Sequence, residues 1–282
     1  MVEGHVNGIY YKKIGEGRPV IFLHGWVVGS NFFEYQMKEL SKNGYSSIAF
    51  DLPGHGKSIS LDDYVKKNGI VEDDREEHEV LLDVIKSVFK SVLNKCKVRP
   101  PYVLVGHSLG SVIAMYLGAI HNGDVAAMVL INPAYKFPEN SILNSYELAQ
   151  PLLSLAEPFK GAISVVFSPL ISLFLKKPVG FSKTLIKQVL TAGSTTAKKE
   201  FNSIKNLDLR VSVNRTNVLK NIKVPVLIIG GSYDIIVPVS HSRDLEKMLN
   251  ANIRILRGGH GLALEKTKEV NKIILKFLKD KA

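Results

Sequence analysis

The stretch that identifies the fold runs from Tyr102 to Gly110 and reads Tyr102-Val103-Leu104-Val105-Gly106-His107-Ser108-Leu109-Gly110. Its first four residues are rich in β-branched and apolar side chains and predict a strand, whereas Ser111 to Leu117 predicts a helix. Between them lies the pattern G-x-S-x-G, which is informative in this context because a sharp strand-to-helix turn exposes the serine hydroxyl. Glycines flank the serine because larger side chains would clash in the turn. We therefore predict an α/β fold in which Ser108 is a candidate nucleophile.

Further short apolar runs along the chain also predict strands, and longer segments with helical periodicity lie between them, such as the apolar stripe from Val80 to Leu93. Asn31 and Glu34 are spaced like a capping box that opens the first helix. Strands that alternate with helices imply a doubly wound, mostly parallel sheet covered on both faces. Ligands bind such sheets beyond the carboxyl ends of the strands. The other predicted strands are Val20–Leu23, Ser47–Phe50, Val125–Ile131, Val226–Ile229 and Ile253–Leu256.

One long segment after Pro133 interrupts this alternation. Five prolines, from Pro138 to Pro178, divide it into short stretches with apolar faces, so it does not read as a simple connection within the sheet. We predict that residues 134–204 form a helical cap, or lid, over the strand ends. Residues 1–133 and 205–282 then form the α/β core.

A serine nucleophile requires a histidine that takes its proton and an acid that orients the histidine. His260 follows the last predicted strand, and Asp234 follows the strand before it. The chain order is therefore Ser, Asp, His, which is typical of this class of fold. We expect Ser108, Asp234 and His260 to meet at one edge of the sheet as a catalytic triad.

Over nearly its whole length the sequence resembles the α/β-hydrolase fold superfamily, in its branch of capped serine hydrolases. The resemblance implies the α/β-hydrolase fold with the cap inserted after the sixth strand. It also implies Ser108 as nucleophile, His260 as base and Asp234 as the partner of His260. The residues that carry the resemblance are His24-Gly25-Trp26, the block from Asp51 to Ser58, the turn at Ser108, and the loops of Asp234 and His260.

The resemblance further implies that the backbone N–H groups of Trp26 and Leu109 form the oxyanion hole, which stabilises negative charge in the transition state. His24 is expected to order this loop rather than to take part in the chemistry, since Gly25 lets the backbone approach the substrate. The residues expected at the substrate pocket are His24, Gly25, Tyr233 and Val237.

Each candidate also has a purely structural interpretation. Ser108 could be an inert turn serine in a binding protein of the same fold, Asp234 a turn former, and His260 a loop histidine. The segment Asn132-Pro133-Ala134, after an earlier strand, offers no alternative acid, which favours Asp234.

The function we expect is hydrolysis of carboxylic esters through an acyl-enzyme intermediate, as in a carboxylesterase or small lipase. The cap segment contains many apolar residues, which favours a small-molecule ester with an apolar acyl or alkyl group. A carbon–carbon bond hydrolase, a lactonase or an amidase would use the same triad, and a non-catalytic ligand receptor could keep the fold. Ser108 argues against the enzymes of this fold that use an aspartate nucleophile.

Composition limits the remaining classes. The 282 residues carry 37 Lys and Arg against 26 Asp and Glu, a net charge of +11. Six of the lysines lie between Lys266 and Lys281 at helical spacing, typical of a solvated helix face, so we do not expect nucleic-acid binding. The sequence shows no signal-peptide pattern and no apolar run that reads as a membrane span, and we expect a cytoplasmic protein. Its oligomeric state is left open.

No cofactor is expected. The histidines show no metal-ligand spacing, because Leu82 stands where an H-E-x-x-H motif after His78 requires histidine. Gly56-Lys57-Ser58 resembles the end of a phosphate-binding loop, but Asp51 occupies the position where that loop requires glycine. Cys96 is the single cysteine and has no partner for an intrachain disulfide.

Overall fold

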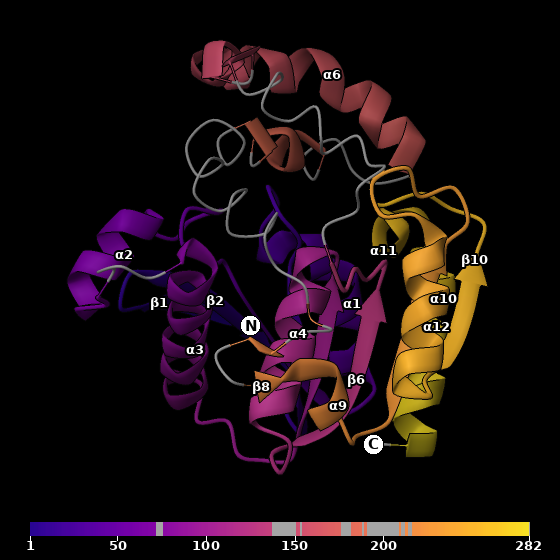
Figure 1. Cartoon of the computed structure of the whole chain (residues 1–282). Coiled ribbons are helices and arrows are strands. Elements are labelled where there is room, and N and C mark those ends of the chain that lie inside the picture. The colour runs from indigo at the N-terminus through magenta and orange to yellow at the C-terminus, as the bar shows by residue number, and fades with distance from the viewer. Residues whose placement is uncertain are drawn as a thin grey trace.

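An eight-stranded sheet forms the centre of the molecule, in the order β1-β2-β4-β3-β5-β6-β9-β10 (Figure 1). The six strands from β4 to β10 in this order are parallel, and the two antiparallel pairs, β1 with β2 and β2 with β4, lie at one end of the sheet. The expected mostly parallel α/β sheet is therefore confirmed. The strands are β1 (Val2–Val6), β2 (Ile9–Ile14), β3 (Arg18–Leu23), β4 (Tyr45–Phe50), β5 (Tyr102–His107), β6 (Val125–Ile131), β9 (Val226–Gly231) and β10 (Asn252–Leu256). The computed structural model describes residues 1–71, 76–136, 151–152, 154–175, 182–187, 189–190, 209, 212–213 and 216–281.

Helices cover both faces of the sheet, as expected for a doubly wound fold, and two apolar clusters fill the space between helices and sheet. One cluster joins the sheet to α2 (Leu61–Asn68), α3 (Glu77–Lys95), α4 (Leu109–Ile120), α9 (Val218–Asn221) and α10 (Val239–Leu249). The other joins it to the 3-10 turn η1 (Ser30–Phe33), α1 (Glu34–Lys42), α11 (Leu262–Glu265) and α12 (Thr267–Lys281).

The hairpin of β1 and β2 was not among the predicted strands. Asn7 and Gly8 connect the two strands, and both have positive φ angles, 51° and 86°. This is the geometry of a two-residue hairpin turn, for which Asn-Gly is the strongest short sequence signal. Val6 and Ile9 pair directly across it.

The start of the first helix also differs from the expected capping box. The 3-10 turn η1 precedes α1, whose N-cap is Phe33, with no side-chain hydrogen bond to the cap. Asn31 accepts a hydrogen bond from the ammonium group of Lys12 instead. Lys12 is buried, so its charge needs a polar partner, and this long-range contact takes precedence over the local cap.

The segment after β6 contributes η3 (Glu157–Phe159) and α6 (Lys160–Leu175) among the described residues. Helix α6 lies at the top of Figure 1, on the side toward which β6 and β10 point. A two-stranded ribbon, β7 (Ser212–Val213) and β8 (Thr216–Asn217), follows further along the chain. Much of the expected cap, including Pro138 and Pro178, lies outside the described residues, so its boundaries at 134 and 204 remain a prediction.

Candidate active site

Ser108 lies on a strained turn between β5 and α4. Its φ and ψ angles are 52° and −120°, a conformation that non-glycine residues rarely adopt. A Cβ atom on Gly106 would lie 2.3 Å from the carbonyl oxygen of Gly110, and one on Gly110 would lie 1.9 Å from the carbonyl oxygen of Leu23. Both clashes are with backbone atoms, so the two glycines are what lets this turn form and present the serine at the strand end.

The His24-Gly25-Trp26 loop passes close to this turn. A Cβ atom on Gly25 would lie 3.3 Å from the Cβ of Ser108 and 2.9 Å from Nδ1 of His107. Glycine therefore brings the backbone of this loop beside the serine. Leu109 is the first residue of α4, so its amide has no acceptor within the helix. Of the two expected oxyanion donors, Leu109 thus lies in the turn itself, and Trp26 directly follows Gly25 on the neighbouring loop.

Two buried histidines hold the Trp26 loop in place. His24 Nδ1 donates to the carbonyl of Gly25 at 2.7 Å, and its Nε2 accepts from the amide of Leu52 at 2.9 Å. His55 Nε2 accepts from the amide of Val27 at 3.2 Å. Burial lowers the pKa of His24 to about 4, and burial together with the neighbouring His24 lowers the pKa of His55 to about 3. Both rings are therefore neutral near pH 7, which these acceptor roles require.

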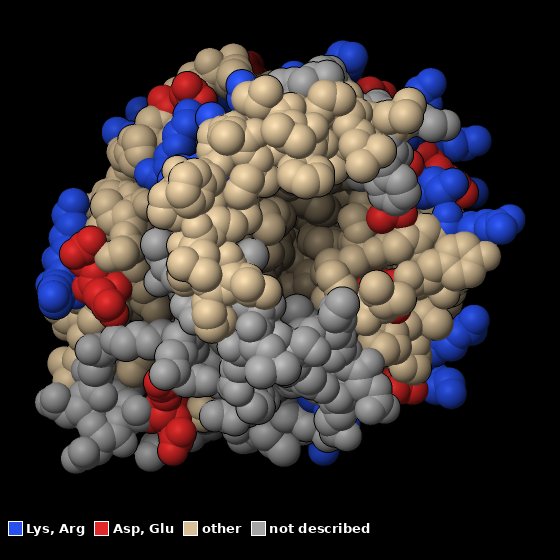
Figure 2. Space-filling view, turned by 90° about the horizontal axis from the view of Figure 1, so that it is seen from above, with Lys and Arg blue, Asp and Glu red and all other residues tan. Residues whose placement is uncertain are grey.

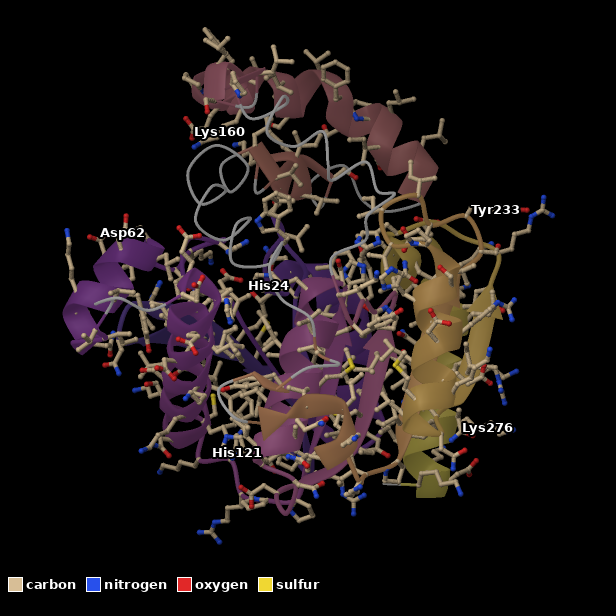
Figure 3. The ribbon with its side chains drawn as sticks, in the orientation of Figure 1. His24, Asp62, His121, Lys160, Tyr233 and Lys276 are labelled. Atoms are coloured by element: carbon tan, nitrogen blue, oxygen red, sulfur yellow. The ribbon has the colours of Figure 1, made fainter. Side chains whose placement is uncertain are left out.

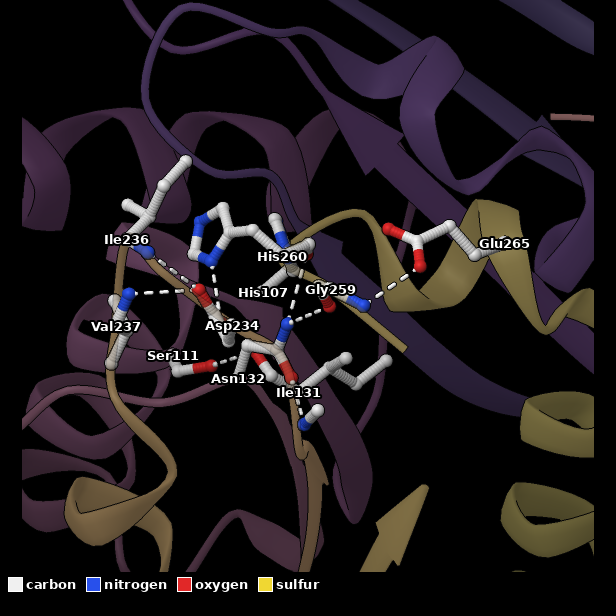
Figure 4. Close-up of polar contacts among 11 residues, drawn as sticks. His107, Ser111, Ile131, Asn132, Asp234, Ile236, Val237, Gly259, His260 and Glu265 are labelled. Carbon is white, nitrogen blue, oxygen red and sulfur yellow. Dashed lines mark hydrogen bonds and ion pairs between the residues drawn. The ribbon is translucent and has the colours of Figure 1, made fainter. Parts of the chain in front are cut away.

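His260 and Asp234 form a direct contact at the same edge of the sheet (Figure 4). His260 Nδ1 donates to Oδ2 of Asp234 at 2.7 Å. The other carboxylate oxygen, Oδ1, accepts from the amides of Ile236 and Val237 at 2.9 and 2.8 Å. The Asp234 side chain is 1 % exposed and that of His260 is 18 % exposed. The carboxylate is thus fixed on both oxygens, while the imidazole still reaches solvent.

His107 connects the serine turn to the His260 loop. Its Nε2 donates to the carbonyl of His260 at 2.8 Å, and the two imidazole centroids lie 4.8 Å apart. Because His107 immediately precedes Ser108, this bond brings the serine turn and the His260 loop together. The described contacts include no hydrogen bond between the Ser108 hydroxyl and the His260 ring. In free enzymes such a bond is often long and tightens only when substrate binds.

Two residues that the sequence interpretation did not assign also hold the His260 loop. Asn132, which was considered there only for lacking a charge, donates from Nδ2 to the carbonyls of Gly259 and His260, both at 2.9 Å (Figure 4). Glu265 accepts from the amide of Gly259 at 2.7 Å. A polar residue directly after a strand was a usable signal for Asn132, whereas no local pattern points to Glu265.

The residues expected at the pocket occupy different environments. His24 lies inside the molecule and uses both ring nitrogens on backbone groups, whereas Tyr233 lies at the outer edge (Figure 3). Tyr233 is 59 % exposed, and the guanidinium group of Arg257 lies 5.7 Å from the centre of its ring. Val237 is buried and contributes its amide to Asp234.

Many apolar residues of the expected cap face outward rather than inward. The argument for an apolar substrate assumed that such residues are too numerous for a solvated face, yet eight of these side chains are exposed. They are Leu152, Leu155, Phe159, Val165, Val166, Phe167, Leu170 and Leu173. Leu153 and the side chains of Phe174 and Leu175, which belong to the same apolar set, lie outside the described residues.

No group of three or more His, Cys, Asp or Glu side chains that could hold a metal ion occurs in the described part of the chain. The polar groups assembled at the strand ends are instead a hydroxyl, an imidazole, a carboxylate and backbone amides. These are the groups that acyl transfer by nucleophilic catalysis requires.

Comparisons with known proteins identify the family and the fold. The profile of a family described as alpha/beta hydrolase fold matches residues 18–267. An AB hydrolase superfamily protein of Bacillus subtilis is 29 % identical over 281 residues, which cover 98 % of this chain and 96 % of that protein. A non-heme haloperoxidase of Rhodococcus erythropolis is 28 % identical, with 96 % and 95 % covered. The structure of an esterase from Rhodococcus sp. superposes with a TM-score of 0.72 at 22 % identity, covering 97 % of this chain and 95 % of that one.

Proposed function

The chain belongs to the alpha/beta hydrolase fold family, and from that membership we propose that it is a serine hydrolase that cleaves carboxylic esters through an acyl-enzyme intermediate. The observation that carries the proposal is the hydrogen bond between His260 and the buried carboxylate of Asp234. The loop of His260 is in turn hydrogen-bonded to His107, the residue before Ser108. A loop histidine with a purely structural role has no need of a buried, fully hydrogen-bonded carboxylate. A general base does, because the carboxylate fixes its tautomer and stabilises its charged form.

In the proposed mechanism, Oγ of Ser108 attacks the ester carbonyl carbon while Nε2 of His260 takes the hydroxyl proton. Nδ1 keeps its proton and its hydrogen bond to Asp234, which stabilises the imidazolium. The tetrahedral intermediate then collapses: the bond to the alkoxy group breaks, and His260 gives that group its proton. A water molecule, deprotonated by His260, attacks the acyl-enzyme in the same way and releases the acid and free Ser108.

The amides of Trp26 and Leu109 are proposed to donate to the oxygen that becomes negatively charged. Each such donor contributes roughly 3–4 kcal/mol to stabilising the transition state in comparable enzymes. The neutral His24 and His55 support this role, since both bond to backbone on either side of Trp26.

We assign an apolar acyl or alkyl group to the ester. The support is the hollow seen from above in Figure 2, whose described wall is mostly of residues other than Lys, Arg, Asp and Glu, with acidic atoms at one edge. It opens on the side of the molecule where the strands end and α6 lies. An apolar group gains about 25 cal/mol per Å² that it buries in such a site.

The test is hydrolysis of p-nitrophenyl esters from acetate to palmitate by the wild type, Ser108→Ala, and the surface control Ser41→Ala. We expect a preference for an acyl chain longer than acetyl, a loss of at least about 10³-fold in Ser108→Ala, and an unchanged rate in Ser41→Ala. An unchanged rate in Ser108→Ala would exclude the serine mechanism, and a preference for acetate alone would exclude the apolar acyl group. If no ester is cleaved, cleavage of a lactone, an amide or a carbon–carbon bond, or plain ligand binding, would replace ester hydrolysis as the activity.

A further inference from the structure

Helix α6 exposes large apolar side chains, unlike a surface helix that packs on a soluble core. The side chains on its inner face include Ser164 and Ser168, which are 0 % and 1 % exposed, while Ile171 packs against the core cluster below. Its outer face carries Val165, Val166, Leu170 and Leu173. Of these, Val166, Leu170 and Leu173 are 68 %, 66 % and 77 % exposed. A surface helix normally turns its apolar stripe inward and its polar residues to water.

The outer face of α6 is part of a larger exposed apolar surface. Leu152, Leu155 and Phe159 precede the helix and are likewise exposed. Soluble monomers rarely expose large contiguous apolar patches, and those that do use them to bind another surface. The concentration of large exposed apolar residues between positions 152 and 173 therefore indicates an interaction surface.

The charge around this surface is mostly positive. From Pro158 to Lys199 the sequence contains seven lysines and no aspartate or glutamate. The helix itself carries no charged residue from Gly161 to Leu175, and lysines stand at both of its ends, at position 160 and at 176 and 177. Two acids adjoin this stretch: Glu157, which forms an ion pair with Lys160, and Glu200, which directly follows Lys199.

We propose that the outer face of α6 docks the protein on an anionic lipid surface. Apolar side chains on a helix flanked by lysines have the chemistry of helices that lie in the membrane interface, where apolar groups enter the acyl region and lysines meet anionic headgroups. A second copy of this chain would place the same lysine-rich segments, each with a net positive charge, against each other. A nucleic acid would match the lysines but would leave the apolar face exposed.

Docking in this orientation would turn the hollow of Figure 2 toward the lipid, because the hollow opens on the face that α6 occupies. An apolar ester could then pass from the lipid to the strand ends without crossing water. The described helices include none that is long and apolar enough to cross a bilayer, and attachment through one exposed helix face does not require one. The docking itself does not depend on the proposed catalysis.

The experiment is co-sedimentation of the full chain with sucrose-loaded vesicles of phosphatidylcholine alone or with one third phosphatidylglycerol. The proteins are the wild type, Leu170→Asp, Leu173→Asp and the control Met248→Asp, which changes an exposed apolar residue on α10. We expect binding to the anionic vesicles that weakens at least tenfold in each α6 variant, weakens with added salt, and is unchanged in Met248→Asp. Both α6 positions are exposed, so the variants should fold, and circular dichroism checks this.

Ser108→Ala separates docking from catalysis, because it should bind vesicles like the wild type while losing ester hydrolysis. Failure of the proposed function therefore leaves the vesicle result intact. Equal binding to both vesicle types, no binding to either, or equal binding by the Leu170→Asp variant would overturn the docking proposal. So would a dimer in sedimentation velocity that Leu170→Asp dissociates, since the outer face would then bind a second copy.

Discussion

Asn132 donates from Nδ2 to the backbone carbonyl of His260 at 2.9 Å, across 128 positions of sequence. Its Oδ1 accepts from the amide of Gly231 at 2.9 Å, at the end of the strand that leads to Asp234. One buried side chain after β6 thus connects the loop that carries His260 to the strand that precedes Asp234. The relative position of His260 and Asp234 therefore depends on Asn132, which need not contact substrate.

Replacing Asn132 with alanine removes all of its side-chain hydrogen bonds to these loops. We expect kcat for a p-nitrophenyl ester to fall about tenfold to a hundredfold with KM changed less than about threefold, because a small displacement of His260 costs rate rather than binding. Asn132→Asp keeps an acceptor for Gly231 but directs its other oxygen at two carbonyls, so it should not restore the rate. Steady-state kinetics below the melting temperature measure this, and an effect on KM alone would contradict a positioning role.

Asp234→Asn should lower kcat by about 10³-fold to 10⁴-fold while the fold is kept. The amide oxygen can still accept from Ile236 and Val237, but the amide nitrogen cannot accept the proton of His260 Nδ1. The imidazole then loses the tautomer that leaves Nε2 free to act as a base. Kinetics with a matched thermal melt check this prediction. A loss under tenfold would mean that another group orients His260.

The stability should fall as the pH drops below about 6.5. Burial lowers the pKa of His24 from 6.5 to about 4 and that of His55 to about 3. At pH values between these lowered pKa values and 6.5, the unfolded chain therefore binds more protons than the folded one. Stabilisation is therefore complete above pH 6.5 and is lost progressively toward pH 4, by about 3 kcal/mol for His24. Urea unfolding at several pH values measures it. His24→Gln should flatten the dependence, and an equally steep dependence in that variant would contradict the assignment.

Gly106→Ala should destabilise the protein by about 3 kcal/mol or more, or prevent folding, because the added Cβ would lie 2.3 Å from a backbone oxygen. Gly123→Ala is the matched control, since nothing lies within 4 Å of its Cβ position. The control should stay within about 0.5 kcal/mol of the wild type. Urea unfolding compares the two, and similar stabilities would show that the turn can relax.

The strands and the candidate triad positions could be predicted because each depends on local patterns. All six predicted strands are present, and parallel strands place their carboxyl ends at one edge of the sheet, where Ser108, Asp234 and His260 lie. The hairpin at Asn7 and Gly8 was also within reach of the sequence, since that dipeptide is a recognised turn signal. The structure shows the contact between Asp234 and His260, and the catalytic roles of the two residues remain a prediction.

Other features depend on distant parts of the chain and leave no local signal. Asn31 does not cap the first helix because it accepts a hydrogen bond from Lys12 of β2 instead. The contact of Glu265 with Gly259 spans only six residues, but it depends on the chain turning back on itself at α11, which no sequence pattern indicated. The outward face of α6 was hidden for another reason: a helix that is apolar nearly all round does not reveal from its periodicity which side faces the core.

The most direct measurement of the central claim is the site of reaction with diisopropyl fluorophosphate, located by peptide mass spectrometry. The claim is that His260, oriented by Asp234, activates Ser108, so Oγ should displace fluoride and form one phosphoryl adduct. We predict an adduct on the Ser108 peptide that forms with loss of ester hydrolysis and is slowed at least about 10³-fold in His260→Ala. Ester hydrolysis that continues with Ser108 unmodified, or an adduct on Ser108 that forms equally fast without His260, would contradict the account.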